Sequence, residues 1–180
     1  MAWRLSRQAV NDPGVSQSAV TQPRLGAASA LESRSLDCAS ADPYRLERFV
    51  KAQDGVHAQA LNELGAGRKA SHWMWFVFPQ VAGLGSSPTS QRYAIGSLEE
   101  ARAYLEHPVL GPRLVECARA LLSHPDRDAR EIMGSPDDAK LRSSMTLFAL
   151  AADAEPLFQQ VLDTFFAGDR DQRTVDLLGG

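Results

Sequence analysis

Hydrophobic positions recur at helical spacing along most of the chain after residue 42, and frequent breakers divide them into short segments. The clearest pattern is in the stretch 109–122, where apolar residues return every three or four positions. The segment 97–105 opens with Ser97 and carries Glu100 three positions later, which is typical of an N-terminal capping box. Because proline or glycine borders many of these segments, each helix is expected to be short.

The same pattern predicts an all-α fold, built as a compact orthogonal array of about seven short helices. Helical segments are expected over 42–53, 56–64, 71–78, 97–105, 109–122, 139–151, 155–167 and 171–178, with shorter turns of helix near 88–93 and 132. No segment shows convincing period-two alternation. The apolar run 71–78 is too short for periodicity to separate a buried helix from a buried strand, and its helical surroundings favour a helix.

Residues 1–41 differ from the rest of the chain. They are rich in Ser, Ala, Gln and Arg and carry no sustained hydrophobic periodicity, so we expect a disordered N-terminal extension. The pattern changes at Asp42 and Pro43, which are typical of an N-cap followed by proline at the first helical position. We therefore expect one α-helical domain over residues 42–180.

Charge and cysteine usage narrow the class of protein. The net charge is −3 and the basic residues are scattered, so neither nucleic acid nor an anionic membrane surface is an expected partner. No run approaches the roughly 20 apolar residues that cross a bilayer. Cys38 and Cys117 are far apart and belong to no metal-ligand motif, which indicates free thiols in a reducing, cytoplasmic setting. We expect no bound metal and identify no cofactor motif.

The segment 67–80 is the densest apolar stretch, and it contains two of the three tryptophans. Aromatic side chains bury large areas, so this segment is expected to anchor the core. Lys69, His72 and Gln80 lie at its edges. Lys69 could form an anion clamp or could neutralise helix carbonyls. A positive helix end would keep His72 neutral, as a general base requires, although a structural role is the alternative.

A second group of polar residues lies later in the chain. On a helix, Asp137, Lys140 and Ser144 share one face, so they could line a polar pocket. The alternative is a surface ion pair between Asp137 and Lys140, with the hydroxyl bonded to the preceding turn. Tyr93, after the glycine- and serine-rich loop 83–87, is a further candidate for the same pocket.

Several blocks in order resemble the domain-of-unknown-function 1810 family over about residues 43–178. They are Gly67-Arg68-Lys69, Ser71-His72-Trp73-Met74-Trp75-Phe76, Phe78-Pro79-Gln80, His107-Pro108-Val109-Leu110-Gly111, Ser143-Ser144-Met145-Thr146-Leu147-Phe148 and Gly168-Asp169-Arg170-Asp171. The resemblance implies a compact α-helical domain, bacterial for the most part, with no settled activity. Some members of the family carry a calpastatin label, but an extended, disordered inhibitor is unlike a compact helical domain.

Our functional hypothesis joins these candidates in one cleft beside the segment 72–76. Lys69, His72, Gln80, Tyr93, Lys140 and Ser144 are expected to border it. Their cations, hydroxyls and aromatic surface suit a small anionic or nucleotide-like ligand such as an ADP-ribose-like compound. Enzymatic activity is left open, with His72 as the candidate catalytic base for hydrolysis or transfer. The alternative is a non-catalytic module for protein–protein interaction, in which the polar blocks serve as caps.

Overall fold

The computed structural model describes residues 42–152 and 155–179 and confirms the all-α class. The predicted disorder of residues 1–41 concerns residues outside this range. Ten helices lie within it: α1 Glu47–Gln53, α2 His57–Gly65, α3 Met74–Val77, α4 Pro88–Arg92, α5 Leu98–Glu106, α6 Leu110–Leu122, α7 Ala129–Met133, α8 Asp137–Ala151, α9 Leu157–Phe166 and α10 Gln172–Leu177. Each of the ten overlaps a segment where a helix or a turn of helix is expected, and α3, α4 and α7 have only four or five residues each.

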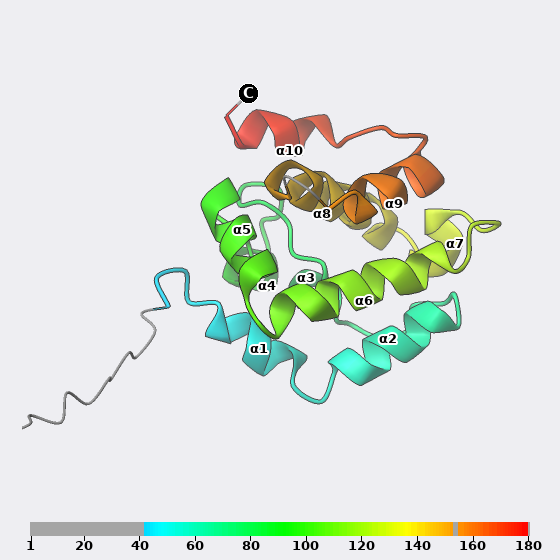
Figure 1. The fold of residues 1–180 in the computed structure, drawn as a ribbon, viewed down its shortest axis with the longest axis horizontal. Helices are drawn as coiled ribbons and strands as arrows, with labels where there is room; N and C mark the ends of the chain where they lie inside the picture. The colour runs from blue at the N-terminus through cyan, green and yellow to red at the C-terminus, as the bar shows by residue number, and fades with distance from the viewer. Residues whose placement is uncertain (1–41, 153–154, 180) are drawn as a thin grey trace, which may run out of the picture. The chain divides into compact units, whose positions relative to one another are not determined.

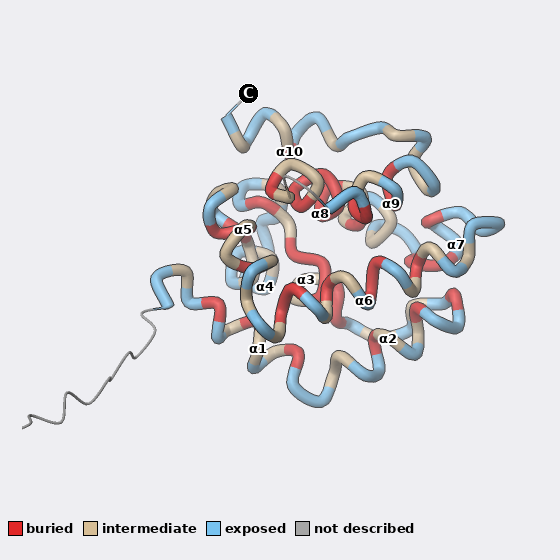
Figure 2. Tube along the Cα trace, viewed as in Figure 1, coloured by how far each residue is buried: buried red, intermediate tan, exposed pale blue. Residues whose placement is uncertain are grey.

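Helix α8 forms the centre of the domain. Its residues 143–148 are all buried, and it packs against α5, α7, α9 and α10. A helix buried on every side belongs to the interior of a bundle, because no face is left for solvent. Figure 2 shows buried residues along α8, along α6 and around α3. Three polar residues, Ser143, Ser144 and Thr146, therefore lie inside the domain.

Helix α6 positions the tryptophan-rich segment. It lies between α2 and α9 (Figure 1), and it also contacts α3. The short helix α3 in turn packs against α1. The segment that follows α3 forms an isolated parallel bridge from Val81 to Ile95. The apolar run 71–78 is thus held from several sides, and helix rather than strand is the observed state of its centre.

Several helix starts differ from the sequence-based expectation. Helix α1 begins at Glu47 rather than directly after Asp42, because residues 42–45 form a turn with Arg45 at a positive φ of 52°. The Asp42 carboxylate still caps the helix by accepting hydrogen bonds from the N–H groups of Leu46 and Glu47, at 2.7 and 2.9 Å. The N-cap role predicted for Ser97 is confirmed.

The predicted capping box is only half formed. Glu100 donates its N–H to the Ser97 hydroxyl, but its carboxylate accepts from the Gly96 N–H and pairs with Arg48. Ser71 does not cap α3, whose N-cap position is held by Trp73. In each case a tertiary partner outside the helix competes for a group that sequence reasoning assigned to a local cap.

No helix within the described residues is long and apolar enough to cross a membrane.

Candidate functional site

The segment from Gly67 to Trp73 is fixed to α2 by one carboxylate. Glu63 accepts hydrogen bonds from the Ala70 and Ser71 N–H groups, from the Ser71 hydroxyl and from the Trp73 indole Nε1, at 2.7 to 3.0 Å. Burial alone would raise the pKa of Glu63, but these hydrogen bonds outweigh it and lower the pKa from 4.5 to about 2. A polar residue on α2 therefore shapes the loop that carries Lys69 and His72.

The C-terminal end of α2 is capped by side chains from the segment 124–127, which lies far along the chain. Gly67 has a φ of 67°, and the Arg127 guanidinium donates to its carbonyl at 2.8 Å. His124 Nε2 lies 3.0 and 2.9 Å from the Leu64 and Gly65 carbonyl oxygens. These donors satisfy carbonyl groups that the end of a helix leaves without partners.

Two lysines meet on one aspartate where this loop approaches α8. Lys69 Nζ lies 2.6 Å from Asp137 Oδ2, and Lys140 Nζ lies 2.7 Å from Asp137 Oδ1. Burial works to raise the pKa of Asp137, but the hydrogen bonds and charges of Lys140 and Lys69 lower it below its usual value. The side chain of Lys69 is only 8% exposed, whereas that of Lys140 is 24% exposed. The three charges leave one positive charge in excess.

Each of these lysines also faces a tryptophan ring. Lys69 Nζ lies 5.1 Å from the ring centroid of Trp73, and Lys140 Nζ lies 4.9 Å from that of Trp75. Such distances allow cation–π attraction. Trp73 is fully buried, while Trp75 remains half-buried. The structure thus joins Lys69 and Lys140, which are 71 positions apart in the chain, through Asp137 and the two indoles.

The remaining candidates form no hydrogen bond or ion pair with Lys69 or Lys140 among the described residues. His72 is exposed, between Lys69 and Trp75 in the sequence. Gln80 is half-buried, and its backbone carbonyl accepts a hydrogen bond from Ile95 N–H at 2.9 Å. Its position is therefore set by main-chain pairing.

Tyr93 and Ser144 occupy different surroundings. The Tyr93 ring packs edge-on against Phe76 at 5.5 Å and tilted against Phe49 at 5.8 Å. Ser144 is fully buried one turn after Lys140, and its hydroxyl has no hydrogen-bond partner among the described residues. The structure therefore brings Lys69 and Lys140 together, and places Tyr93 with the aromatic group on the α1 side.

Sequence reasoning identified the Asp137–Lys140 pair as an alternative but missed two contributors. Glu63 carried no signal, because a glutamate on the polar side of a helix resembles any solvated residue. Trp75 was assigned to the core, although its half-burial and its lysine make it part of the site. Within the described residues, no group of three or more His, Cys, Asp or Glu side chains is placed to hold a metal ion.

Comparison with known proteins places this arrangement in a family. The model of the family described as "Protein of unknown function (DUF1810)" matches residues 43–178. The chain belongs to this DUF1810 family. The blocks that carry the tryptophans and the two lysines lie inside the matched range.

A solved structure supports the fold assignment. The chain is similar to the conserved hypothetical protein Rv1873 from Mycobacterium tuberculosis, known from a crystal structure. The two share 55% sequence identity and a TM-score of 0.76, and the match covers 77% of this chain and 99% of that one. No curated protein matches the chain.

Proposed function

We propose that this DUF1810 domain binds a small anionic, nucleotide-like ligand beside the segment 72–76. The observation that carries the proposal is the convergence of Lys69 and Lys140 on the single carboxylate of Asp137, next to two indole rings. The two ammonium groups and the one carboxylate leave a single positive charge, which a phosphate group can neutralise.

The two lysines have different parts in this proposal. Lys69 is nearly buried and also donates to the Ser71 carbonyl oxygen at 2.8 Å, so its ammonium is held in place. Lys140 is more exposed and bonds only to Asp137 among the described residues. Lys140 is therefore the group that meets the ligand, while Lys69 keeps Asp137 oriented.

The aromatic surface favours a nucleotide-like ligand over a simple anion. Trp75 is half-buried and already faces a cation, and an indole ring can stack with a nucleobase. A ligand that joins a base or ribose to phosphate, such as an ADP-ribose-like compound, would use both Trp75 and Lys140. His72 is exposed in the same segment and is the candidate base if the bound ligand is hydrolysed or transferred.

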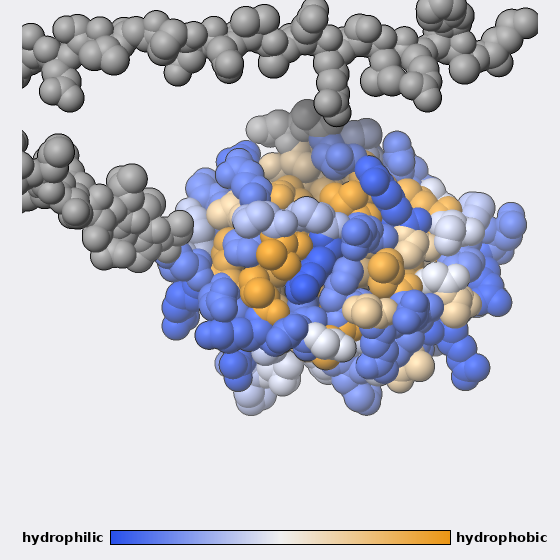
Figure 3. Space-filling model, turned by 60° about the horizontal axis from the view of Figure 1, so that its bottom comes forward, coloured by the Kyte–Doolittle hydropathy of each residue, from blue (hydrophilic) through white to orange (hydrophobic). Residues whose placement is uncertain are grey.

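The alternative is a module for protein–protein interaction. Figure 3 shows one face of the molecule, where hydrophobic residues form separate patches divided by hydrophilic ones. Among the described residues, Leu177 is the one large hydrophobic side chain that is exposed, at 48%. Interfaces between proteins usually centre on a contiguous apolar patch. The surface therefore supports a compact ligand better than a broad protein partner.

Calorimetric titration of the full chain with ADP-ribose and with AMP tests the proposal. We expect saturable binding that Lys140→Ala weakens about tenfold or more, because a charge-assisted contact is lost. Asp137→Asn is expected to bind more tightly than the parent, since it removes the carboxylate that competes for both lysines. Lys51→Ala, which changes an exposed lysine on α1, is the matched control.

Tryptophan fluorescence locates the ligand. Stacking on Trp75 should quench the emission of the parent, and Trp75→Phe should remove that part of the quenching. Absence of saturable binding by both compounds, or equal binding by the parent and Lys140→Ala, would contradict the proposal. A His72→Ala variant that binds but no longer turns over the ligand would then assign the catalytic base.

A further inference from the structure

A polar cavity lies apart from the site described above. Its volume is about 290 Å³, and it opens between the start of α1 and the segment 91–96. The charged residues that line it are Arg45, Arg48, Arg92 and Glu100. Three positive charges and one negative charge leave two positive charges around a space that suits a small molecule.

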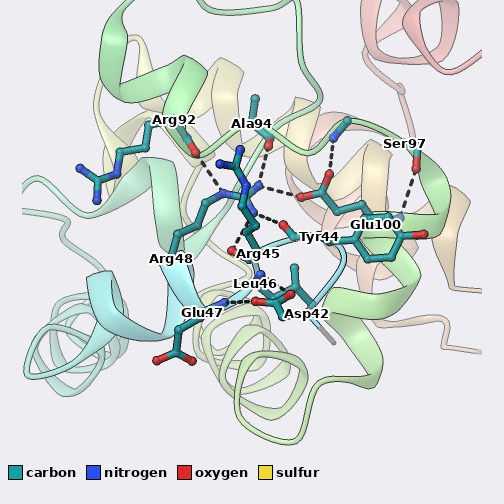
Figure 4. A network of polar contacts seen from close by, with 11 residues as sticks. Asp42, Tyr44, Arg45, Leu46, Glu47, Arg48, Arg92, Ala94, Ser97 and Glu100 are labelled. Atoms are coloured by element: carbon teal, nitrogen blue, oxygen red, sulfur yellow. Dashed lines mark hydrogen bonds and ion pairs between the residues drawn. The ribbon is translucent and has the colours of Figure 1, made fainter. Parts of the chain in front are cut away.

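Arg48 lines this cavity, and each of its guanidinium N–H groups already has an acceptor. Its guanidinium donates to the carbonyl oxygens of Arg92 at 3.0 Å, Ala94 at 2.9 Å, Arg45 at 3.0 Å and Tyr44. It also pairs with Glu100 at 2.7 Å (Figure 4). A guanidinium carries five N–H groups, and this network uses all five. Arg48 is therefore a positioning residue that joins the chain before α1 to the segment 92–96.

Arg45 and Arg92 are different. Both are exposed, and within residues 42–152 and 155–179 neither guanidinium has a hydrogen-bond or ion-pair partner. The Arg92 side chain extends away from the Arg48 network in Figure 4 and lies over the Tyr93 ring at 5.5 Å. It is long and exposed, so rotation about its own side-chain bonds can bring its guanidinium back over the cavity.

The backbone at Arg45 adds an independent observation. Its φ of 52° lies in the left-handed region, which costs free energy for any residue with a Cβ. Glycine or asparagine would meet this turn with less strain. Strained non-glycine residues tend to occur at functional sites. There, the role of the side chain explains why the position is not glycine.

We propose that this cavity is an anion site that takes the phosphate group of a small molecule, with Arg45 and Arg92 as its ligands. A phosphate monoester carries between one and a half and two negative charges near neutral pH. That charge matches the two positive charges of the lining more closely than a single carboxylate would. The planar guanidinium also matches the paired oxygens of phosphate.

The test is a titration of the isotope-labelled full chain with inorganic phosphate at constant ionic strength, followed by NMR of the backbone amides. We expect saturable shifts at Arg45, Ala94 and Gly96. Arg45→Gly should weaken this binding about tenfold or more, because it removes a charged ligand. The same variant should melt at a temperature equal to or above that of the parent, because glycine relieves the positive φ.

Three controls make the outcome decisive. Arg130→Ala changes an exposed arginine on α7 and should bind phosphate as the parent does. Lys140→Ala should also keep the shifts at Arg45 and Gly96, which separates this cavity from the site beside Trp75. Acetate should bind more weakly than phosphate. Equal phosphate binding by Arg45→Gly and the parent would overturn the anion site, and equal binding of acetate would overturn its assignment to phosphate.

Discussion

Glu63 and Asp137 are two carboxylates that border the same tryptophan-rich segment, yet they are neutralised in different ways. Glu63 accepts four hydrogen bonds from uncharged donors, three of them on the loop 70–71 and one on Trp73. Asp137 instead faces two ammonium groups. The first arrangement satisfies a carboxylate completely and leaves nothing for a ligand. The second leaves a surplus cation beside an accessible indole.

The comparison separates structure from function within a short stretch of sequence. Trp73 belongs to the Glu63 side, where its indole N–H donates to the carboxylate and its ring is fully buried. Trp75 belongs to the Asp137 side, where the ring is half-buried and faces Lys140. Neighbouring tryptophans thus have different roles, and each role can be tested by removing one side chain.

The largest expected effect separates the two tryptophans. Trp73→Ala should lower the free energy of unfolding by about 3–5 kcal/mol, because it opens a cavity in the core and removes a donor from Glu63. Trp75→Ala should cost about 1–2 kcal/mol, since part of the ring is already in contact with water. Urea denaturation of both variants measures the difference. Equal losses would mean that Trp75 is a core residue like Trp73.

An effect of intermediate size is the loss of folding stability at low pH. The pKa of Glu63 is lowered from 4.5 to about 2 in the folded chain, so its contribution to stability is complete above about pH 4.5. That contribution is lost as the pH falls from 4.5 toward 2, because the unfolded state then takes up the proton first. Thermal melts across this range should show the parent losing stability steadily.

Glu63→Gln isolates this contribution. The variant should lose roughly 2–4 kcal/mol at neutral pH, because charge-assisted hydrogen bonds are replaced by weaker ones. Its stability should also fall less steeply as the pH is lowered. The decline that is left is due to Asp137, whose pKa is lowered as well. Glu131→Gln, an exposed position on α7, is the control and should follow the parent. A variant with the acid profile of the parent would remove Glu63 as the anchor of the loop.

The sequence was a good guide to the helices and a partial guide to the site. The all-α class followed from the helical spacing of apolar residues and from the breakers between segments. A helix that buries one face needs apolar residues at regular positions in the sequence. The Asp137–Lys140 pair followed from i, i+3 spacing within one helix. The link from Lys69 to Asp137, and the hydrogen bonds of Glu63, depend on how the loop meets α8 and α2. Such contacts between distant segments leave no local pattern, so Trp73 and Trp75 could not be told apart.

The smallest effect on stability belongs to the lysines, and it is the one that decides between a structural ion cluster and a binding site. Lys140→Ala should change the free energy of unfolding by less than about 1 kcal/mol, as is usual for a partly exposed ion pair. Lys69→Ala should cost somewhat more, about 1–2 kcal/mol, because the nearly buried ammonium also donates to the Ser71 carbonyl. If both lysines served the ion cluster alike, Lys140→Ala would be as damaging as Lys69→Ala. If Lys140 contributes little to folding and ligand affinity depends on it, its ammonium group serves to bind the ligand.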